Sequence, residues 1–229
     1  MNLTAFTGPL KVLGILALFA AATATLGNAS SARQAVPGPR LDAPLAGKAG
    51  LQTAVFAGGC FWGIEAVFEH VEGVRDASSG YAGGSAASAD YATVSAGRSA
   101  HAESVKLVFD PSIISYGQLL KIFFSVAHDP TQLNRQGPDR GRQYRSAIFS
   151  TSPEQQRIAT AYIAQMTAAK TFGDEPIVTR VEPLRAFFPA EEYHQDFARL
   201  NPTHPYITYW DAPKVAALKR EFPAWYRSN

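Results

Sequence analysis

The stretch Leu51–Glu65 reads "LQTAVFAGGCFWGIE", and its character changes in the middle. Its first half, "LQTAVFA", is β-prone and runs into Gly58-Gly59, which predicts a strand that ends in a turn. Beyond the turn, apolar residues recur at helical spacing until Gly73. The chain therefore passes from strand to helix at Cys60, which is its only cysteine.

Strand and helix patterns alternate irregularly along the rest of the chain. Residues 85–100 are poor in large apolar side chains, but Tyr91 and Val94 indicate a packed functional loop. Connections are both short and of crossover length, which favours an α+β fold with a mixed, split-βαβ sheet over a regular doubly wound sheet. Strands are predicted at 74–84, 101–111, 144–150 and 177–183, and helices at 116–128, 153–173, 189–200 and 211–222.

The N-terminal part differs in composition from the rest. Lys11 precedes an uncharged apolar run over residues 12–27, and small residues follow it, which predicts a secretory signal peptide over residues 1–32. The run is short against the roughly 20 residues that span a bilayer. Residues 33–50, rich in Pro, Gly and Ala, predict a flexible linker, and residues 51–229 a single domain. We expect export to the periplasm, with secretion or an uncleaved helical tether as alternatives.

Composition narrows the possible functions. The net charge is +2 with both signs interspersed, so nothing predicts binding to nucleic acid or polybasic attachment to a membrane. The histidines form no pair at a spacing of three or four residues and there is no second cysteine, which argues against a metal site. We expect a monomer. A lone cysteine in an exported chain is inert, intermolecular or reactive, because it cannot form an internal disulfide.

The surroundings of Cys60 favour a reactive thiol. Free amide groups and the positive end of the dipole at a helix start favour a thiolate, but the dipole contributes only about 0.3–1 kcal/mol, so more activation needs a proton-exchanging neighbour. The alternative is a small buried structural side chain. Phe61 and Trp62 point about 100° apart on a helix, so at least one of them can line a pocket for a methyl or thioether group.

Two glutamates near these elements are candidates for different roles. Glu103 shares the strand face of Val105 and Leu107, so partial burial would raise its pKa and make it a proton donor near neutral pH. Glutamates at strand ends commonly face water, so the alternation along the strand leaves both orientations of Glu103 open. Glu65 lies one helical turn after Cys60 and is interpreted as a capping or surface residue.

These motifs together resemble the methionine sulfoxide reductase A family. "GGCFWGIE" is similar to the active-site signature of that family, "DYATVSAGRSAHAE" to a segment with a tyrosine and a glutamate, and "GPDRGRQYRS" to one with an aspartate and a second tyrosine. "PAEEYHQDF" and the tail also fit. Four separated motifs in register from Leu51 onwards are more specific than one. The resemblance implies a ferredoxin-like fold.

The resemblance also implies a role for each matching residue. Cys60 would be the nucleophile that takes the sulfoxide oxygen, and the substrate would be methionine S-sulfoxide, free or in oxidised proteins and peptides. Glu103 would be the acid. The remaining roles are hydrogen bonds to the sulfoxide oxygen from Tyr91 and Tyr144, a methyl site at Phe61 and Trp62, and places near the pocket for Asp139 and His194.

The chain departs from the resemblance in one important respect. Many members of the family have a resolving cysteine in the loop near Ser95 or in the tail, and this chain has neither. Recycling would therefore need an external thiol, which would be a thioredoxin-like or glutaredoxin-like protein or a small thiol, with no bound cofactor. Two rival functions are a cysteine hydrolase that uses His101 or His194 and a binding module without catalysis.

Overall fold

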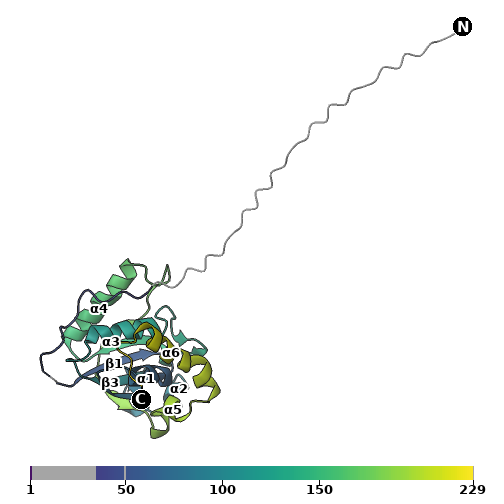
Figure 1. The fold of residues 1–229 in the computed structure, drawn as a ribbon. Coiled ribbons are helices and arrows are strands. Elements are labelled where there is room, and N and C mark those ends of the chain that lie inside the picture. The colour runs from purple at the N-terminus through teal and green to yellow at the C-terminus, as the bar shows by residue number, and fades with distance from the viewer. Residues whose placement is uncertain (2–34, 49, 229) are drawn as a thin grey trace. The chain divides into compact units, whose positions relative to one another are not determined.

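The computed structural model describes Met1 and residues 35–48 and 50–228 (Figure 1). The predicted signal peptide therefore lies outside the described residues apart from Met1. Within the described residues, no helix is both long enough and apolar enough to span a membrane.

The fold is organised around the segment that contains Cys60. Strand β1 (Gln52–Gly58) leads into helix α1 (Phe61–Glu69), and β2 (Val74–Ala82) follows. Strand β3 (Ala102–Phe109) lies between β1 and β2 and is antiparallel to both. Two parallel strands joined by a helix and separated by a third strand form the split-βαβ unit that the sequence predicts.

Three further strands extend this unit into a six-stranded mixed sheet. Strand β6 (Ser146–Ser150) pairs antiparallel with β1, β7 (Arg180–Pro183) pairs parallel with β6, and β8 (Phe187–Pro189) pairs antiparallel with β2. The order is β7-β6-β1-β3-β2-β8, which confirms the α+β class. The sequence did not predict β8, because three residues are too few for an alternating pattern. Strands β4 (Arg135–Gln136) and β5 (Asp139–Arg140) form a separate small hairpin.

The helices after α1 keep the predicted order with different bounds, apart from α2, which lies in the stretch that the sequence predicts as a packed loop. They are α2 (Tyr91–Ser95), α3 (Tyr116–Ile122), α4 (Pro153–Ala168), α5 (Phe197–Leu200) and α6 (Ala212–Glu221). Short helical turns lie at Ala86–Ser88, Arg142–Tyr144 and Glu192–His194, and π-helical turns lie at Phe123–Ala127 and Ile207–Asp211. The single helix predicted at 189–200 is wrong, because Asp196 adopts a left-handed conformation with φ 55° and divides it into two short pieces.

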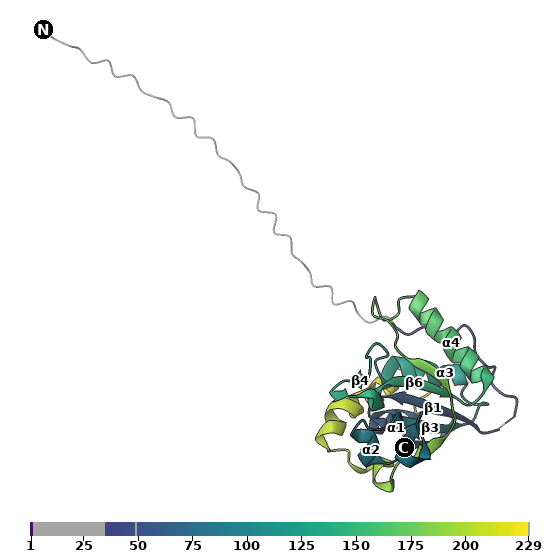
Figure 2. The same ribbon diagram turned by 180° about the vertical axis from the view of Figure 1, so that it is seen from behind.

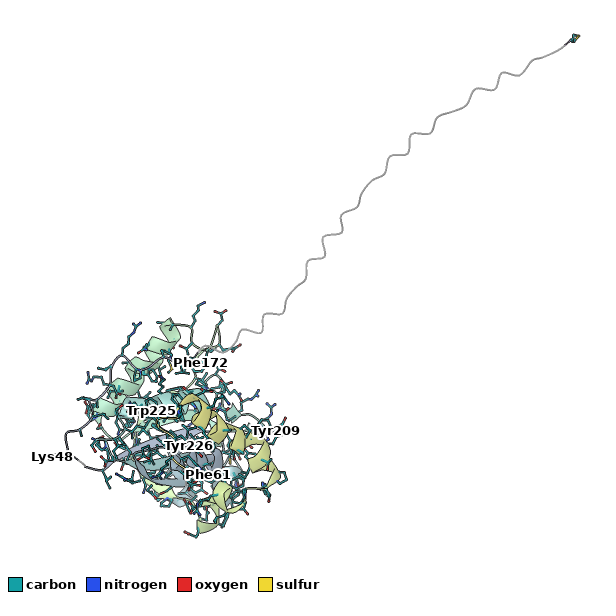
Figure 3. The ribbon with its side chains drawn as sticks, viewed as in Figure 1. Lys48, Phe61, Phe172, Tyr209, Trp225 and Tyr226 are labelled. Atoms are coloured by element: carbon teal, nitrogen blue, oxygen red, sulfur yellow. The ribbon has the colours of Figure 1, made fainter. Side chains whose placement is uncertain are left out.

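The main core lies on one face of the sheet. Alternate residues of β3, namely Val105, Leu107 and Phe109, belong to this core, where α1 packs on β3, and α4 contacts α3 and the strands β6 and β7 (Figures 1 and 2). Figure 3 shows Phe61 within this interior, whereas Tyr209 lies at the edge of the domain. The opposite face carries a smaller cluster that Leu184 and Phe187 cover.

Residues 35–48 pack against the domain, whereas their composition predicts a flexible linker. Val36 is buried, and the carbonyl of Pro37 accepts a hydrogen bond of 2.6 Å from the hydroxyl of Tyr162. Asp42 accepts hydrogen bonds from the hydroxyl of Ser115 and the amide of Gly117, at the start of α3. Proline and glycine give this segment no regular structure of its own, but its backbone and one carboxylate are held by α3 and α4.

Candidate active site

Cys60 lies at the junction of β1 and α1, as the sequence predicts. Gly59 adopts φ +107°, and a Cβ on it would lie 2.6 Å from Cγ of Gln136, so only glycine fits this close turn. The turn makes Cys60 the N-cap residue of α1, and the residue as a whole is half-buried. The thiol therefore lies beside the free amide groups of the helix start.

The carboxyl group of Glu103 lies next to this helix start. Glu103 is on the β3 face that points into the main core, and only 2% of the residue is exposed. Its Oε2 accepts a hydrogen bond of 3.1 Å from the amide of Phe61, the residue after Cys60. Burial raises the pKa of Glu103 to about 8, although the hydrogen bond from Phe61 opposes this. A carboxylic acid that keeps its proton at neutral pH is thus in place beside the thiol.

The environment of Cys60 favours the neutral thiol and not the thiolate that the helix start alone predicts. Burial raises the pKa of Cys60 well above its usual value, and the charges of Glu103 and Asp211 raise it further. The amide of Trp62 acts in the opposite direction but is the weaker effect. The dipole term, worth about 0.3–1 kcal/mol, is too small to outweigh burial beside two carboxyl groups. Ionisation of this thiol near neutral pH therefore needs a proton-exchanging neighbour, as the sequence analysis expects.

The two aromatic residues after Cys60 point in different directions. Phe61 is only 1% exposed, and its ring lies 5.0 Å from that of His194. Trp62 is partly exposed and stacks on Phe197, with ring centroids 3.8 Å apart and planes 10° apart. The indole Nε1 of Trp62 donates a 3.2 Å hydrogen bond to Nδ1 of His194. One aromatic residue is thus mostly core and the other forms a wall whose position is fixed by its neighbours.

The two predicted tyrosines lie within electrostatic reach of the thiol and of Glu103. Burial raises the pKa of Tyr91, and the charges of Glu103 and Cys60 add to this. Burial also raises the pKa of Tyr144, followed by the charges of Glu103, Asp139 and Cys60. Both hydroxyl groups therefore keep their protons at neutral pH, and they feel the charges of the thiol and the acid from α2 and from the turn Arg142–Tyr144.

Asp139 contacts a tyrosine that the sequence analysis missed. The hydroxyl of Tyr206 donates a 2.5 Å hydrogen bond to Oδ2 of Asp139, and the ring of Tyr206 meets the indole of Trp62 edge-on at 5.9 Å. Burial raises the pKa of Asp139, whereas the Tyr206 hydroxyl and Lys214 lower it. Tyr206 belongs to the proline-bounded tail, where no helical or strand pattern singles out one aromatic residue.

A buried ion pair in the C-terminal part was also missed. Asp211 is fully buried, and its Oδ1 lies 3.1 Å from Nζ of Lys214. A Cβ on Gly63 would lie 2.1 Å from this carboxylate oxygen, so the glycine in the first turn of α1 makes room for the pair. The spacing of an aspartate and a lysine three residues apart is common on exposed helices, and burial is what distinguishes this pair.

Neither histidine of the rival hydrolase hypothesis is hydrogen-bonded to Cys60. Nε2 of His101 is 2.9 Å from the carbonyl oxygen of Ser85, and Nδ1 of His194 accepts from Trp62. Burial lowers the pKa of His194. No cluster of three or more His, Cys, Asp or Glu side chains that could hold a metal ion occurs among the described residues.

Comparison with known proteins places the chain in one family of enzymes. The sequence profile of the family described as peptide methionine sulfoxide reductase matches residues 52–225, which include all eight predicted site residues. Peptide methionine sulfoxide reductase MsrA 2 of Mesorhizobium japonicum is 59% identical over 77% of this chain and 90% of its own length. The MsrA 2 of Synechocystis is 57% identical over 76% and 80%.

Solved structures show the same fold. The reduced form of Mxr1 from Saccharomyces cerevisiae has a TM-score of 0.61 at 30% identity, over 72% of this chain and 92% of Mxr1. Methionine sulfoxide reductase A of Corynebacterium diphtheriae has a TM-score of 0.59 at 34% identity, over 75% of this chain and 86% of its own. The chain belongs to the methionine sulfoxide reductase A family, the peptide-methionine (S)-S-oxide reductases.

Proposed function

We propose that this chain reduces methionine S-sulfoxide, both free and in oxidised proteins, through Cys60, and that an external thiol regenerates it. The neutral acid Glu103 beside the thiol is the observation that carries this proposal. Sulfoxide oxygen is a poor leaving group until it accepts a proton, and Glu103, with a pKa of about 8, has one to donate at neutral pH.

The reaction balances with the residues present. The sulfur of Cys60 attacks the sulfoxide sulfur, the oxygen receives a proton from Glu103, and the thiol proton returns to that carboxylate. In the adduct, the hydroxyl group passes from the substrate sulfur to the cysteine sulfur, so the S–O bond and the transient S–S bond both break, methionine leaves, and Cys60 becomes a sulfenic acid. The sulfoxide is thereby reduced by two electrons and the cysteine oxidised by two. The hydroxyl groups of Tyr91 and Tyr144 hold the oxygen during this step.

The methyl group of the substrate lies against the aromatic wall in this proposal. Phe61 and Trp62 form the apolar side, His194 holds the indole through a hydrogen bond, and Asp139 accepts a hydrogen bond from Tyr206, whose ring meets the indole edge-on. An apolar methyl site opposite polar donors to the oxygen can distinguish the two sulfoxide epimers, because only one of them presents both groups correctly.

Regeneration follows from the presence of a single cysteine. A thiol condenses with the sulfenic acid of Cys60 to give a mixed disulfide and water, and a second thiol then releases the Cys60 thiol and a disulfide. A thioredoxin-like or glutaredoxin-like protein, or a small thiol, would supply both reducing equivalents. We also propose, from the pattern of residues 1–32, that the chain acts after export in the periplasm; fractionation of cells that express the full chain tests this point.

Mass spectrometry of Cys60 after a single turnover tests the chemistry. Without a thiol, wild-type protein should form one methionine per chain and carry a sulfenic acid at Cys60, which dimedone traps. With a thiol, the mixed disulfide should appear and turnover should rise in proportion to the thiol. The Cys60→Ser variant should bind the substrate but form no methionine, and a variant that still formed it would overturn the proposal.

A further inference from the structure

Glu65 is a buried carboxyl group that the proposed reaction does not use. It lies on α1, one turn after Cys60, and only 1% of the residue is exposed, so it is not the capping or surface residue that the sequence suggests. Its Oε1 accepts a 3.1 Å hydrogen bond from the amide of Ser79 on β2. Its Oε2 is buried and has no hydrogen-bond partner of normal geometry among the described residues. Burying a polar oxygen without a hydrogen bond costs free energy of folding.

Ser79 connects Glu65 to the segment that follows β8. The amide of Ser79 donates to Oε1 of Gln195 as well, at 3.0 Å, and Nε2 of Gln195 donates to the carbonyl groups of Ser79 and Ala190. The amide of Ala190 donates to the carbonyl of Ser79. Residues 190–195 are the first part of a segment that runs to Arg199, which we call the fastened segment, and they are held to β2 at the same point at which Glu65 reaches it from α1.

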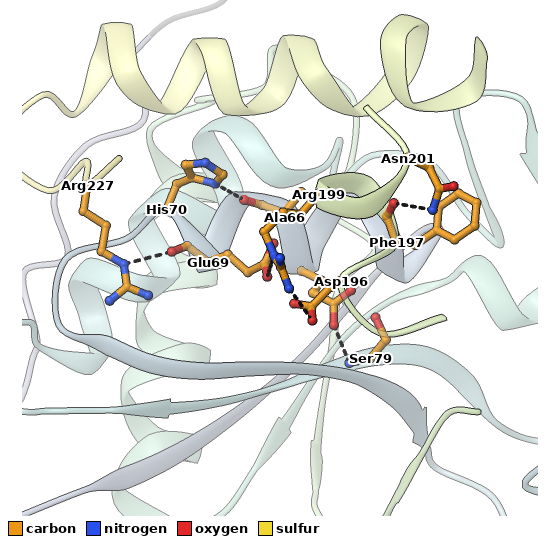
Figure 4. A network of polar contacts seen from close by, with 10 residues as sticks. Ala66, Glu69, His70, Ser79, Asp196, Phe197, Arg199, Asn201 and Arg227 are labelled. Carbon is orange, nitrogen blue, oxygen red and sulfur yellow. Dashed lines mark hydrogen bonds and ion pairs between the residues drawn. The ribbon is translucent and has the colours of Figure 1, made fainter. Parts of the chain in front are cut away.

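A second group of contacts fastens the same segment to α1. Arg199 pairs with Asp196 at 2.6 Å and approaches Glu69, which lies one turn after Glu65, at 3.9 Å. Figure 4 shows Glu69, Asp196 and Arg199 together between α1 and α5, with Ser79 beside them. Burial raises the pKa of Glu69, and the neighbouring carboxyl group of Asp196 raises it further. Asp196 is held in its left-handed conformation by these contacts.

The fastened segment supplies two of the side chains that hold the indole of Trp62. Phe197 follows Asp196 and stacks on the indole at 3.8 Å, and His194 accepts the indole hydrogen bond. We propose that Glu65 is a positioning residue for the reaction: its buried carboxyl group joins the helix that starts at Cys60 to the segment of His194 and Phe197 and so fixes Trp62. This inference rests on the proposed function, because it names the residue that supports the wall of the proposed site for the substrate methyl group.

The proposal predicts a pH dependence, because the charges around Glu65 do not balance. The groups that face it are Glu69 on the same helix, Asp76 on β2, and Glu192, Asp196 and Arg199 on the fastened segment. Burial raises the pKa of Glu65 to about 7 and that of Glu69 to about 8. When these protons leave, one guanidinium faces several carboxylates, so the segment is held tightly below neutral pH and loosens above it.

A comparison of the substrate KM of wild type with that of Glu65→Gln, measured across pH, tests this dependence. Glutamine keeps an acceptor for Ser79 and never ionises, so the ratio of wild-type to variant KM for a methionine sulfoxide peptide should be near one at about pH 6 and rise about fivefold at about pH 9. The ratio cancels the ionisation of Glu103, which both proteins share. Glu192→Gln is the matched control, because its exposed carboxyl group lines the same pocket, and its ratio should stay near one throughout.

A second variant tests the positioning role without turnover. In a background in which Trp210 and Trp225 are replaced by Phe, Trp62 is the only indole, and Glu65→Leu should increase quenching of its fluorescence by acrylamide about twofold or more, as the indole becomes accessible. When Glu65→Leu is added to the protein in which Trp210 and Trp225 are Phe, KM should rise, while kcat should stay within about threefold of the value without Glu65→Leu. Glu192→Gln should leave the quenching unchanged.

The outcomes separate the inference from the proposed function. A flat KM ratio for Glu65→Gln, or unchanged quenching and KM for Glu65→Leu, would overturn the positioning role while wild-type turnover stands. If Glu65→Leu does not fold, the KM ratio for Glu65→Gln decides alone. Absence of turnover in wild-type protein would instead reject the proposed function, and the indole quenching would still report on the contact.

Discussion

A carboxyl group as buried as that of Glu103 destabilises the fold whenever it is ionised. Its pKa is raised to about 8, so the folded protein holds a proton that the unfolded chain loses near its usual value of 4.5. The stability that this proton contributes is complete at low pH and is lost as pH rises towards the folded pKa. The buried carboxyl group therefore costs the folded protein stability once the pH exceeds its folded pKa.

Glu103→Gln should separate these two effects. Glutamine cannot donate a proton to the sulfoxide oxygen, so we expect kcat to fall about 100-fold or more while KM changes little. It removes a buried charge, so the variant should melt at a higher temperature than wild type at about pH 9, and the difference should vanish at about pH 4. Stopped-flow measurement of methionine formation and thermal melts at both pH values check this, and wild-type kcat with Glu103→Gln would remove the residue as the acid.

Helix α1 shows how one element meets two different surfaces. The side of the helix that carries Glu65 and Glu69 faces the fastened segment. Gly63, in the first turn, faces the pair of Asp211 and Lys214. The absence of a side chain at Gly63 lets the C-terminal part approach the start of α1. Because Tyr206 is in that part, the approach also determines where its hydroxyl meets Asp139.

Gly63→Ala should destabilise the protein although alanine is the better helix former. In an exposed helix this change would stabilise by about 1 kcal/mol, but here the new Cβ would lie 2.1 Å from Oδ1 of Asp211. We expect a loss of about 1–3 kcal/mol, as in other overpacked sites. Adding Asp211→Ala should recover part of that loss, and urea unfolding of the four proteins of this double-mutant cycle measures the coupling. Additive losses would show that the two residues do not compete for space.

The elements closest to Cys60 were the ones that the sequence predicts best. The strand, the glycine turn and α1 have local patterns, whereas the alternation in β3 left both orientations of Glu103 open, and the structure has it buried on the core face. The burial of Glu65 was not predicted, because what covers it is the segment around Asp196, more than a hundred residues away. Tyr206 and Asp211 were not identified for the same reason, because their contacts come from long-range packing and not from a local pattern.

For the whole molecule, residues 35–48 extend the domain beyond the boundary that composition suggests. Asp42 holds the start of α3 through two hydrogen bonds, although Ser115 and Gln118 already form a capping box there. Gly117 has no space for a Cβ, which would lie 2.5 Å from the Asp42 carboxylate, so helix and segment fit one another. The segment thus also covers α4, through Pro37 and Tyr162.

A protein that starts at residue 51 should therefore be less stable than one that starts at residue 35. The shorter chain exposes the carboxylate-binding groups of Ser115 and Gly117 and the hydroxyl of Tyr162, and each lost hydrogen bond contributes about 0.5–1.5 kcal/mol. At about 2–4 °C per kcal/mol for a domain of this size, we expect Tm to fall by about 5 °C or more. Asp42→Ala in the longer protein should reproduce part of that fall, and Asp42→Asn less of it, because the amide keeps one acceptor oxygen. Equal melting temperatures for the two lengths would show that the segment rests on the domain without stabilising it.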